Sequence, residues 1–278
     1  MGFSTFNIKL GILLCFTIIN SCKKIKNNEI PAFENLVWGD EFNYNGKIND
    51  SLWHNQTIPI DNGSWANNEL QHYTDNSENC FVKNGILHIV AIKEKIEIHN
   101  SVKNYSSARL NSKFDFKYGR IDVKAKLPLS KGTWPAIWTL GSNIDETGNY
   151  LGNKKGKIPW PYCGEIDIME QNGWDKSNVY NVLHFQNSKT DKKDEIKKIS
   201  KILNSNKFNL YSLIWTDKKI YWLLNNKITF EQDNTDIMPF DNNHYLILNL
   251  AIGGTLGGTV PEKFDKDEIQ IDFVRIFQ

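Results

Sequence analysis

Three carboxylates stand close together in the segment GEIDIMEQNG, residues 164–173. Glu165 and Asp167 are two residues apart, whereas Glu170 follows Asp167 by three. Side chains alternate between the faces of a β-strand, so strict alternation would turn Glu170 away from the other two acids. A β-bulge at Ile168-Met169 would insert one residue and return Glu170 to the acidic face. The spacing therefore predicts a bulged strand that presents all three carboxylates on one concave surface, with the isoleucines in the core behind.

The chemistry that such a cluster could perform follows from its charge. Three ionised carboxylates at this spacing repel one another, so at least one should hold a proton near neutral pH. A protonated acid beside an ionised one is the pair of groups that glycoside hydrolysis uses. The same segment, taken alone, also fits an exposed strand whose acids are solvated.

The elements that must position these acids are predicted to be short β-strands. Alternating or continuous apolar patterns indicate strands over residues 85–92, 121–127, 210–215, 220–224, 228–230, 245–252 and 269–277. Thr216–Lys219 and Asn225-Asn226 separate three of them as hairpin turns. Many short strands with turns between them are typical of an all-β sandwich or jelly roll. One helix is expected, over Asp194–Leu203, as a lysine-rich surface insertion.

The N-terminal residues read as an export signal. Leu10–Ile19 is an apolar run preceded by Lys9, and it is too short to span a bilayer. It ends in Ile19-Asn20-Ser21-Cys22, which resembles a bacterial lipoprotein signal and implies lipid attachment at Cys22; an ordinary secretory signal is the alternative. We expect a signal peptide over 1–21, a polar tether over 22–32 and one domain over 33–278. The lipid would hold the protein at the outer membrane or cell surface, and a periplasmic or secreted protein is the other option.

Composition limits the partners. A net charge of +1 provides no global field for a polyanion, and no basic stripe accompanies an aromatic platform, so no nucleic acid partner is expected. The histidines form no metal-binding array. Cys80 and Cys163 remain after the signal, as two buried thiols or as a pair. We expect a monomer.

A series of motifs then sets the acidic segment in context. In chain order they are WGDEF (38–42), NELQHYT (68–74), SAR (107–109), GTWPAIW (132–138), Trp160-Pro161, GEIDIME (164–170), NLAIGG (249–254) and DFVR (272–275). Together they resemble glycoside hydrolase family 16, most closely its laminarinase-like endo-β-1,3-glucanases, over nearly all of Phe33–Gln278. The resemblance implies a concanavalin A-like β-jelly roll with an open concave cleft, a β-glucan substrate and no catalytic cofactor.

The resemblance also assigns roles to residues. Glu165 would be the nucleophile and Glu170 the general acid/base of a retaining mechanism, with their carboxyls about 5–5.5 Å apart. Asp167 would hydrogen-bond Glu165 and help to keep Glu170 protonated. Substrate-binding residues would be Asn67, Arg109, Trp134, Trp138, Trp160 and His184. Trp38, Trp53, Trp215 and Trp222 are instead expected in the core, and Trp65 and Trp174 fit either role.

Other implications of the resemblance are less direct. Family members often bind one calcium ion on the convex face, and the matching positions are Glu41, the carbonyl of Gly85, and Asp272; two surface acids are the plainer interpretation. The chain departs from many laminarinases at Phe185–Asn187 and at Thr255-Leu256, which leaves the linkage preference open.

Three alternative functions are considered. The ExDxxE spacing also occurs in agarases and related enzymes of the family, so an agarase- or carrageenase-like hydrolase is one. A mixed-linkage β-glucanase is the second. The third is a non-catalytic glucan-binding protein on the same fold, but such relatives lose the acids that this chain keeps. Sulfated galactans require Arg or Lys in the cleft, and among the motifs only Arg109 offers one.

Overall fold

The structure is a computed structural model that describes residues 1–2, 30–60, 63–98, 100–150, 156–202 and 204–278. The chain divides into two units, residues 1–32 and 33–278, and the second carries the fold. The predicted signal core and the lipidation site Cys22 lie outside the described residues, as does most of the tether. Among the described helices, none has the length and apolar character needed to cross a membrane.

Within the described residues, ten strands form the first sheet. Eight of them lie in the order β15 (Lys227–Asp233), β14 (Lys219–Leu224), β13 (Asn209–Trp215), β8 (Gly119–Lys126), β17 (Lys266–Phe277), β5 (Ile86–Ile98), β6 (Ser101–Ser107) and β3 (Gln71–Tyr73). The other two are β1 (Leu36–Asp40), which pairs with β17, and β4 (Cys80–Lys83), which pairs with β5. The strands predicted over 85–92, 121–127, 210–215, 220–224, 228–230 and 269–277 all belong to this sheet.

The second sheet has seven strands in the described part of the chain. Their order is β12 (Lys192–Lys201), β11 (Asn178–Asn187), β10 (Glu165–Glu170), β9 (Thr133–Gly141), β16 (His244–Ile252), β7 (Arg109–Phe116) and β2 (Trp53–Asn55). Two short helical turns, η1 (Ala66–Asn68) and α1 (Gly254–Gly257), lie in the connections. Strand β10, with the three acids, is therefore an interior strand between β9 and β11.

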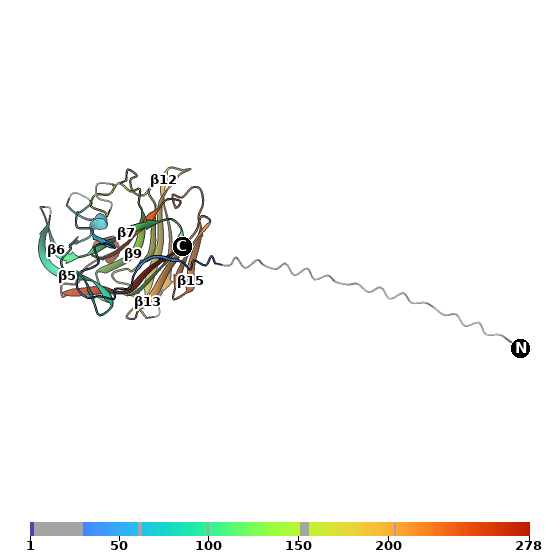
Figure 1. Cartoon of the computed structure of the whole chain (residues 1–278), viewed down its shortest axis with the longest axis horizontal. Helices are drawn as coiled ribbons and strands as arrows, with labels where there is room; N and C mark the ends of the chain where they lie inside the picture. Colours follow the sequence, from blue (N-terminus) through green and yellow to red (C-terminus); the bar gives the residue numbers. More distant parts are fainter. Residues whose placement is uncertain (3–29, 61–62, 99, 151–155, 203) are drawn as a thin grey trace. The chain divides into compact units, whose positions relative to one another are not determined.

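The hydrophobic core lies between the two sheets, which form two layers (Figure 1). Leu248 on β16 and Ile271 on β17 are both fully buried in it. Trp53, Trp215 and Trp222 are also buried there, and Trp38 packs against them, as the sequence predicts. The fold is the expected all-β sandwich of jelly-roll type.

The helix predicted over Asp194–Leu203 is wrong. Residues 194–201 belong to β12, which pairs with β11 along its whole length. Ile196 and Ile202 contact the core, whereas the side chains of odd-numbered residues such as Glu195 take the opposite face. Pairing with β11 therefore overrides the helix-favouring composition of the segment.

Candidate active site

The predicted bulge is present in β10 and aligns the three acids. Asp167 pairs with Trp138 of β9 and Met169 pairs with the next residue, Ile137, so Ile168 is the inserted residue. Ile168 and Met169 are both buried in the core, although they are consecutive in the strand. Glu165, Asp167 and Glu170 consequently all line one pocket on the outer face of the sheet.

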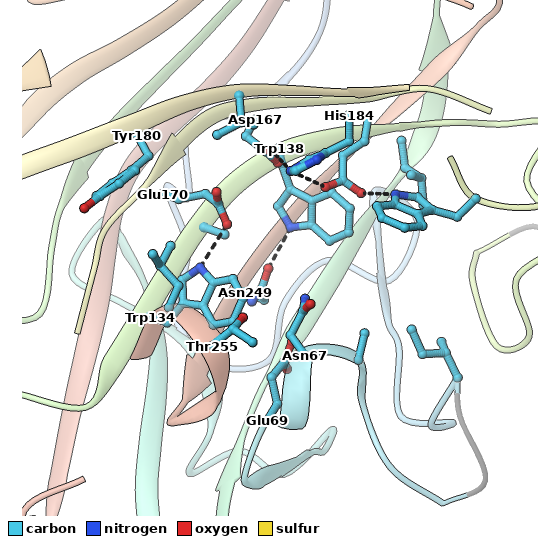
Figure 2. Close-up of a pocket in the computed structure, with 18 of the residues that line it drawn as sticks. Asn67, Glu69, Trp134, Trp138, Asp167, Glu170, Tyr180, His184, Asn249 and Thr255 are labelled. Carbon is cyan, nitrogen blue, oxygen red and sulfur yellow. Dashed lines mark hydrogen bonds and ion pairs between the residues drawn. The ribbon is translucent and has the colours of Figure 1, made fainter. Parts of the chain in front are cut away.

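Each of the two catalytic candidates accepts a hydrogen bond from a tryptophan. Trp160 donates its indole N–H to Glu165 Oε2 at 2.9 Å. Trp134 donates to Glu170 Oε1, also at 2.9 Å, as Figure 2 shows. Both tryptophans were expected as sugar-stacking platforms, and the structure gives each a second contact, with a carboxyl. A hydrogen bond to a charged acceptor is stronger than a neutral one, so these indoles orient the carboxyls and favour their ionised forms.

Asp167 is the most buried member of the cluster, at 2% exposed. Its Oδ2 has no hydrogen-bond partner among the described residues and lies 3.5 Å from His184 Nε2. The hydrogen bond expected between Asp167 and Glu165 is absent from the described contacts. His184 Nε2 instead lies beside both acids, 3.8 Å from Glu165 Oε1.

Burial and repulsion from nearby acids raise the pKa of all three carboxyls; for Glu170 the repelling acids are Glu195 and Glu69. Burial is the largest cause in each case. The pKa of Glu165 rises to about 8, with the charge of Glu170 as the second cause. That of Glu170 rises to about 7, and its hydrogen bond with Trp134 acts in the opposite direction. The pKa of Asp167 lies well above its ordinary value. The cluster therefore retains protons near neutral pH, as expected from three carboxyls so close together. Because the three groups titrate together, these protons are shared by the cluster.

The acids face a cleft of about 490 Å³. All six residues that the resemblance assigned to substrate binding line it: Asn67, Arg109, Trp134, Trp138, Trp160 and His184. Trp160 is the most exposed of the three tryptophans, at 42%. Its ring is capped by Lys193 Nζ, 3.9 Å from the ring centroid. A cleft that combines aromatic rings with many polar and charged side chains suits the apolar C–H faces and the hydroxyls of sugar rings.

Arg109 differs from the expectation of a free sugar-binding side chain. It is buried, and its Nη2 lies 2.9 Å from Glu146 Oε1. Its guanidinium stacks 4.9 Å from the Trp138 ring centroid and 5.8 Å from that of Trp65. Arg109 therefore packs against the ring of Trp138 and helps to hold it in place. Trp65, for which the sequence left a core role or a cleft role open, is buried beside the same guanidinium.

Several cleft residues were not singled out by sequence reasoning. Glu69, Glu146, Tyr180, Lys193, Glu195, Lys197 and Asn249 all line the pocket. Three of them lie on β12, whose assignment as a helix concealed an alternating strand pattern. Glu69 and Asn249 stand inside motifs already quoted, NELQHYT and NLAIGG, so the signal for them was present. Thr255 and Leu256 also line the cleft, whereas Phe185 is buried in the core.

The predicted calcium ligands have cationic partners in this structure. Glu41 forms a two-point contact with Arg275, from Nε at 2.6 Å and from Nη2 at 2.8 Å. Asp272 pairs with Lys124 Nζ at 2.6 Å. In the described chain, the group of three acidic or histidine side chains that could hold a metal ion is Glu165, Asp167 and His184.

The geometry defines a class of protein. Two carboxyls, with a proton shared in their cluster, face an aromatic cleft on the outside of a β-sandwich, which is the equipment of a glycoside hydrolase. The comparison with known families agrees, because the family Glycosyl hydrolases family 16 matches residues 53–275. The chain belongs to this family, whose hydrolysis requires no catalytic cofactor.

Relatives within the family act on β-glucans by name. Glucan endo-1,3-beta-glucosidase A1 from Niallia circulans is 33% identical over 273 residues, which cover 88% of this chain and 38% of that protein. The solved structure of LamAcat from Zobellia galactanivorans is 51% identical, with a TM-score of 0.86, over 88% of this chain and 98% of that one. A LamA variant from the same organism, in complex with laminaritriose and laminaritetraose, has a TM-score of 0.87 at 51% identity and covers 89% of this chain and all of its own.

Proposed function

We propose that this protein cleaves β-1,3-glucan internally and with retention of anomeric configuration. The observation that carries the proposal is the bulged strand β10, which places Glu165 and Glu170 on one face with an indole N–H on each. The LamA complex with laminari-oligosaccharides supports the choice of glucan. A cleft with Trp160 beside Glu165 and Trp134 beside Glu170 suits attack within a chain, because each tryptophan can stack on a sugar ring.

The mechanism follows from the two carboxyls. Glu170 donates its proton to the glycosidic oxygen while the carboxylate of Glu165 attacks the anomeric carbon, forming a glycosyl ester and releasing the leaving chain. Glu170 then removes a proton from water, which attacks the ester and regenerates Glu165. Two inversions at the anomeric carbon give net retention. Asp167, buried between them, disfavours a second negative charge and so helps to keep Glu170 protonated before attack.

The test is loss of either carboxyl without loss of fold. We expect Glu165→Gln and Glu170→Gln to reduce laminarin hydrolysis by several orders of magnitude, since the two groups act as a unit. Circular dichroism would establish that the variants are folded. Azide should restore turnover to Glu165→Ala by replacing the missing nucleophile, and the product should be an α-glucosyl azide. Substantial laminarin hydrolysis by Glu165→Gln would contradict the assignment.

The charge of the cleft bears on a second substrate class, the sulfated galactans. Lys193 and Lys197 line the cleft from β12, so cationic groups for sulfated galactans are present beyond Arg109. Lys197 Nζ is already paired with Glu195 Oε1 at 3.0 Å, and Lys193 sits on the Trp160 ring. Because both lysines already have partners, the cleft favours the neutral glucan. Reducing-sugar assays on laminarin, lichenan, agarose and carrageenan decide among the classes; activity confined to agarose or carrageenan would keep the mechanism and replace the substrate.

Calcium is a proposal about stability. We propose that Ca²⁺ can bind Glu41, the carbonyl of Gly85 and Asp272 on the face away from the cleft, because hard cations take oxygen ligands of this kind. Binding would require Arg275 and Lys124 to release the two carboxylates. Chelator should then lower the melting temperature of protein purified with calcium, since an ion bound by the folded state stabilises it. An unchanged melting temperature together with no calcium in the purified protein would remove the site.

Export and anchoring are proposed from the sequence. The Ile19–Cys22 pattern supports a lipid on Cys22 that holds a monomeric enzyme at the outer membrane or cell surface, where polysaccharide is accessible. Mass spectrometry of the mature N-terminus should find a diacylglyceryl adduct at Cys22, and Cys22→Ala should release the protein from membranes. An unmodified N-terminus downstream of Cys22 would exclude the anchor.

A further inference from the structure

A further carboxylate, Glu69, lies on the wall of the cleft across from the catalytic acids. It directly follows η1 and pairs with Gly253 in an isolated β-bridge. Figure 2 shows Glu69 and Asn67 on one side of the pocket and Asp167 and Glu170 on the other. The mechanism assigns no role to this side chain.

The hydrogen bonds of Glu69 occupy one of its carboxylate oxygens and leave the other available to a ligand. Its Oε2 accepts two hydrogen bonds, from Gln71 Nε2 at 2.6 Å and from the Tyr73 hydroxyl at 2.9 Å. Gln71 is itself fixed, because its Oε1 accepts the backbone N–H of Ile252 at 2.7 Å. None of the described hydrogen bonds reaches Glu69 Oε1. A carboxylate can accept up to about four hydrogen bonds, so Oε1 retains acceptor capacity in the cleft.

The same hydrogen bonds connect Glu69 to the cleft floor. The Tyr73 hydroxyl, which donates to Glu69, accepts Asn249 Nδ2 at 3.0 Å. Asn249 Oδ1 in turn accepts the Trp138 indole N–H at 2.7 Å. The Tyr73 hydroxyl donates its one proton to Glu69, so the arrangement requires Glu69 as an acceptor. Burial raises the pKa of Glu69, whereas the hydrogen bonds from Gln71 and Tyr73 lower it and favour the ionised form.

We infer that Glu69 is a specificity-determining residue, which accepts hydrogen bonds from hydroxyls of a neutral sugar residue and excludes sugars with an anionic substituent at that position. This inference rests on the proposed function and refines its substrate class. Hydroxyls can donate to Oε1, whereas a sulfate ester or a uronate only accepts and repels the like charge. The second wall of the cleft thus opposes the attraction that Lys193 and Lys197 would exert on sulfated chains.

The test compares a neutral ligand with a charged one. For wild type and Glu69→Gln, kcat and KM are measured on laminarin, and partially sulfated laminari-oligosaccharides are assayed as competitive inhibitors. The Gln variant keeps an oxygen for Gln71 and Tyr73 but turns an N–H₂ toward the cleft. We expect KM for laminarin to rise and the inhibition constant of the sulfated ligand to fall, each by roughly ten-fold. Glu69→Asp, which keeps the charge, should retain weak binding of the sulfated ligand.

Each outcome has one meaning. A purely structural role for Glu69 would weaken both ligands together in Glu69→Gln, and that result would overturn the inference. Equal loss of discrimination in Glu69→Asp would also overturn it. Glu231→Gln on β15 of the other sheet, an exposed acid paired with Lys219, is the matched control and should change neither constant. If wild type fails to cleave laminarin at all, the proposed function fails first, which separates the two conclusions.

Discussion

The two indole hydrogen bonds to the catalytic carboxyls predict opposite changes in the pH profile. Trp134→Phe and Trp160→Phe each remove one N–H donor and keep an aromatic ring. The pKa of Glu170 is lowered by Trp134 and that of Glu165 by Trp160, so each variant should raise the pKa of its own carboxyl. Glu170 must be protonated for the first step, whereas Glu165 must be ionised. Because the pKa of Glu165 is raised further than that of Glu170, this productive form is one of the proton distributions of the coupled cluster.

The size of the effect follows from the contacts. Both donor–acceptor distances are 2.9 Å, and a hydrogen bond to a charged group contributes about 1.5–3 kcal/mol. Since one pKa unit corresponds to about 1.4 kcal/mol, and water can replace part of the lost contact, a shift of about one unit is expected. Activity at high pH falls when Glu170 loses its proton, so Trp134→Phe should move the alkaline limb upward. Activity at low pH falls when Glu165 gains a proton, so Trp160→Phe should move the acid limb upward and narrow the profile.

The assay is kcat/KM on laminari-oligosaccharides across pH, because this ratio reports the ionisations of the free enzyme. Loss of sugar stacking would lower kcat/KM at every pH and would leave both limbs in place. Trp174→Phe is a control, since its indole N–H donates to the Thr259 carbonyl and contacts neither acid. The reasoning is refuted if both variants move the same limb, or if neither limb moves.

Three further changes test other parts of the site. Deleting Ile168 removes the bulge and leaves plain alternation, which still turns Glu170 to the face of Glu165 and Asp167, so a folded variant should keep part of its activity; complete loss of activity in a folded variant would refute the register argument. Asp167→Asn should reduce kcat clearly but less than Glu165→Gln does, and unchanged kcat would remove Asp167 from the mechanism. Glu170→Gln should melt above wild type at pH 9 in differential scanning calorimetry. Burial raises the pKa of Glu170 from 4.5 to about 7, so the stability that its protonated form provides is lost as pH rises through 7; a lower melting temperature would contradict this.

Sequence reasoning predicted the strands correctly where apolar and polar side chains alternate and one face of the strand is buried. The bulge at Ile168 was predictable because three acids and two isoleucines leave one arrangement that satisfies both faces of β10. The strand β12 was missed because its lysine-rich sequence is compatible with a solvated helix as well as with a strand. Its pairing with β11 determines that it is a strand. Local sequence does not contain that pairing.

Within the site, the residue types were predictable but several contacts were not. Trp134 and Trp160 were expected in the cleft, yet nothing in their spacing shows that each indole N–H meets a catalytic carboxyl. Arg109 was expected at the sugar, and its partner Glu146 is 37 residues away in a long connection. The role of Glu69 depends on hydrogen bonds to Gln71 and Tyr73 that side-chain rotamers determine. Contacts of this kind follow from tertiary packing.

The most direct test of the central claim is the anomeric configuration of the first product. Proton NMR would follow laminarin cleavage by the wild-type enzyme during the first minutes, before mutarotation. Double displacement through Glu165 predicts that the new reducing ends appear first as the β-anomer, with the α-anomer growing later. Initial release of the α-anomer would show a single displacement and would contradict the account.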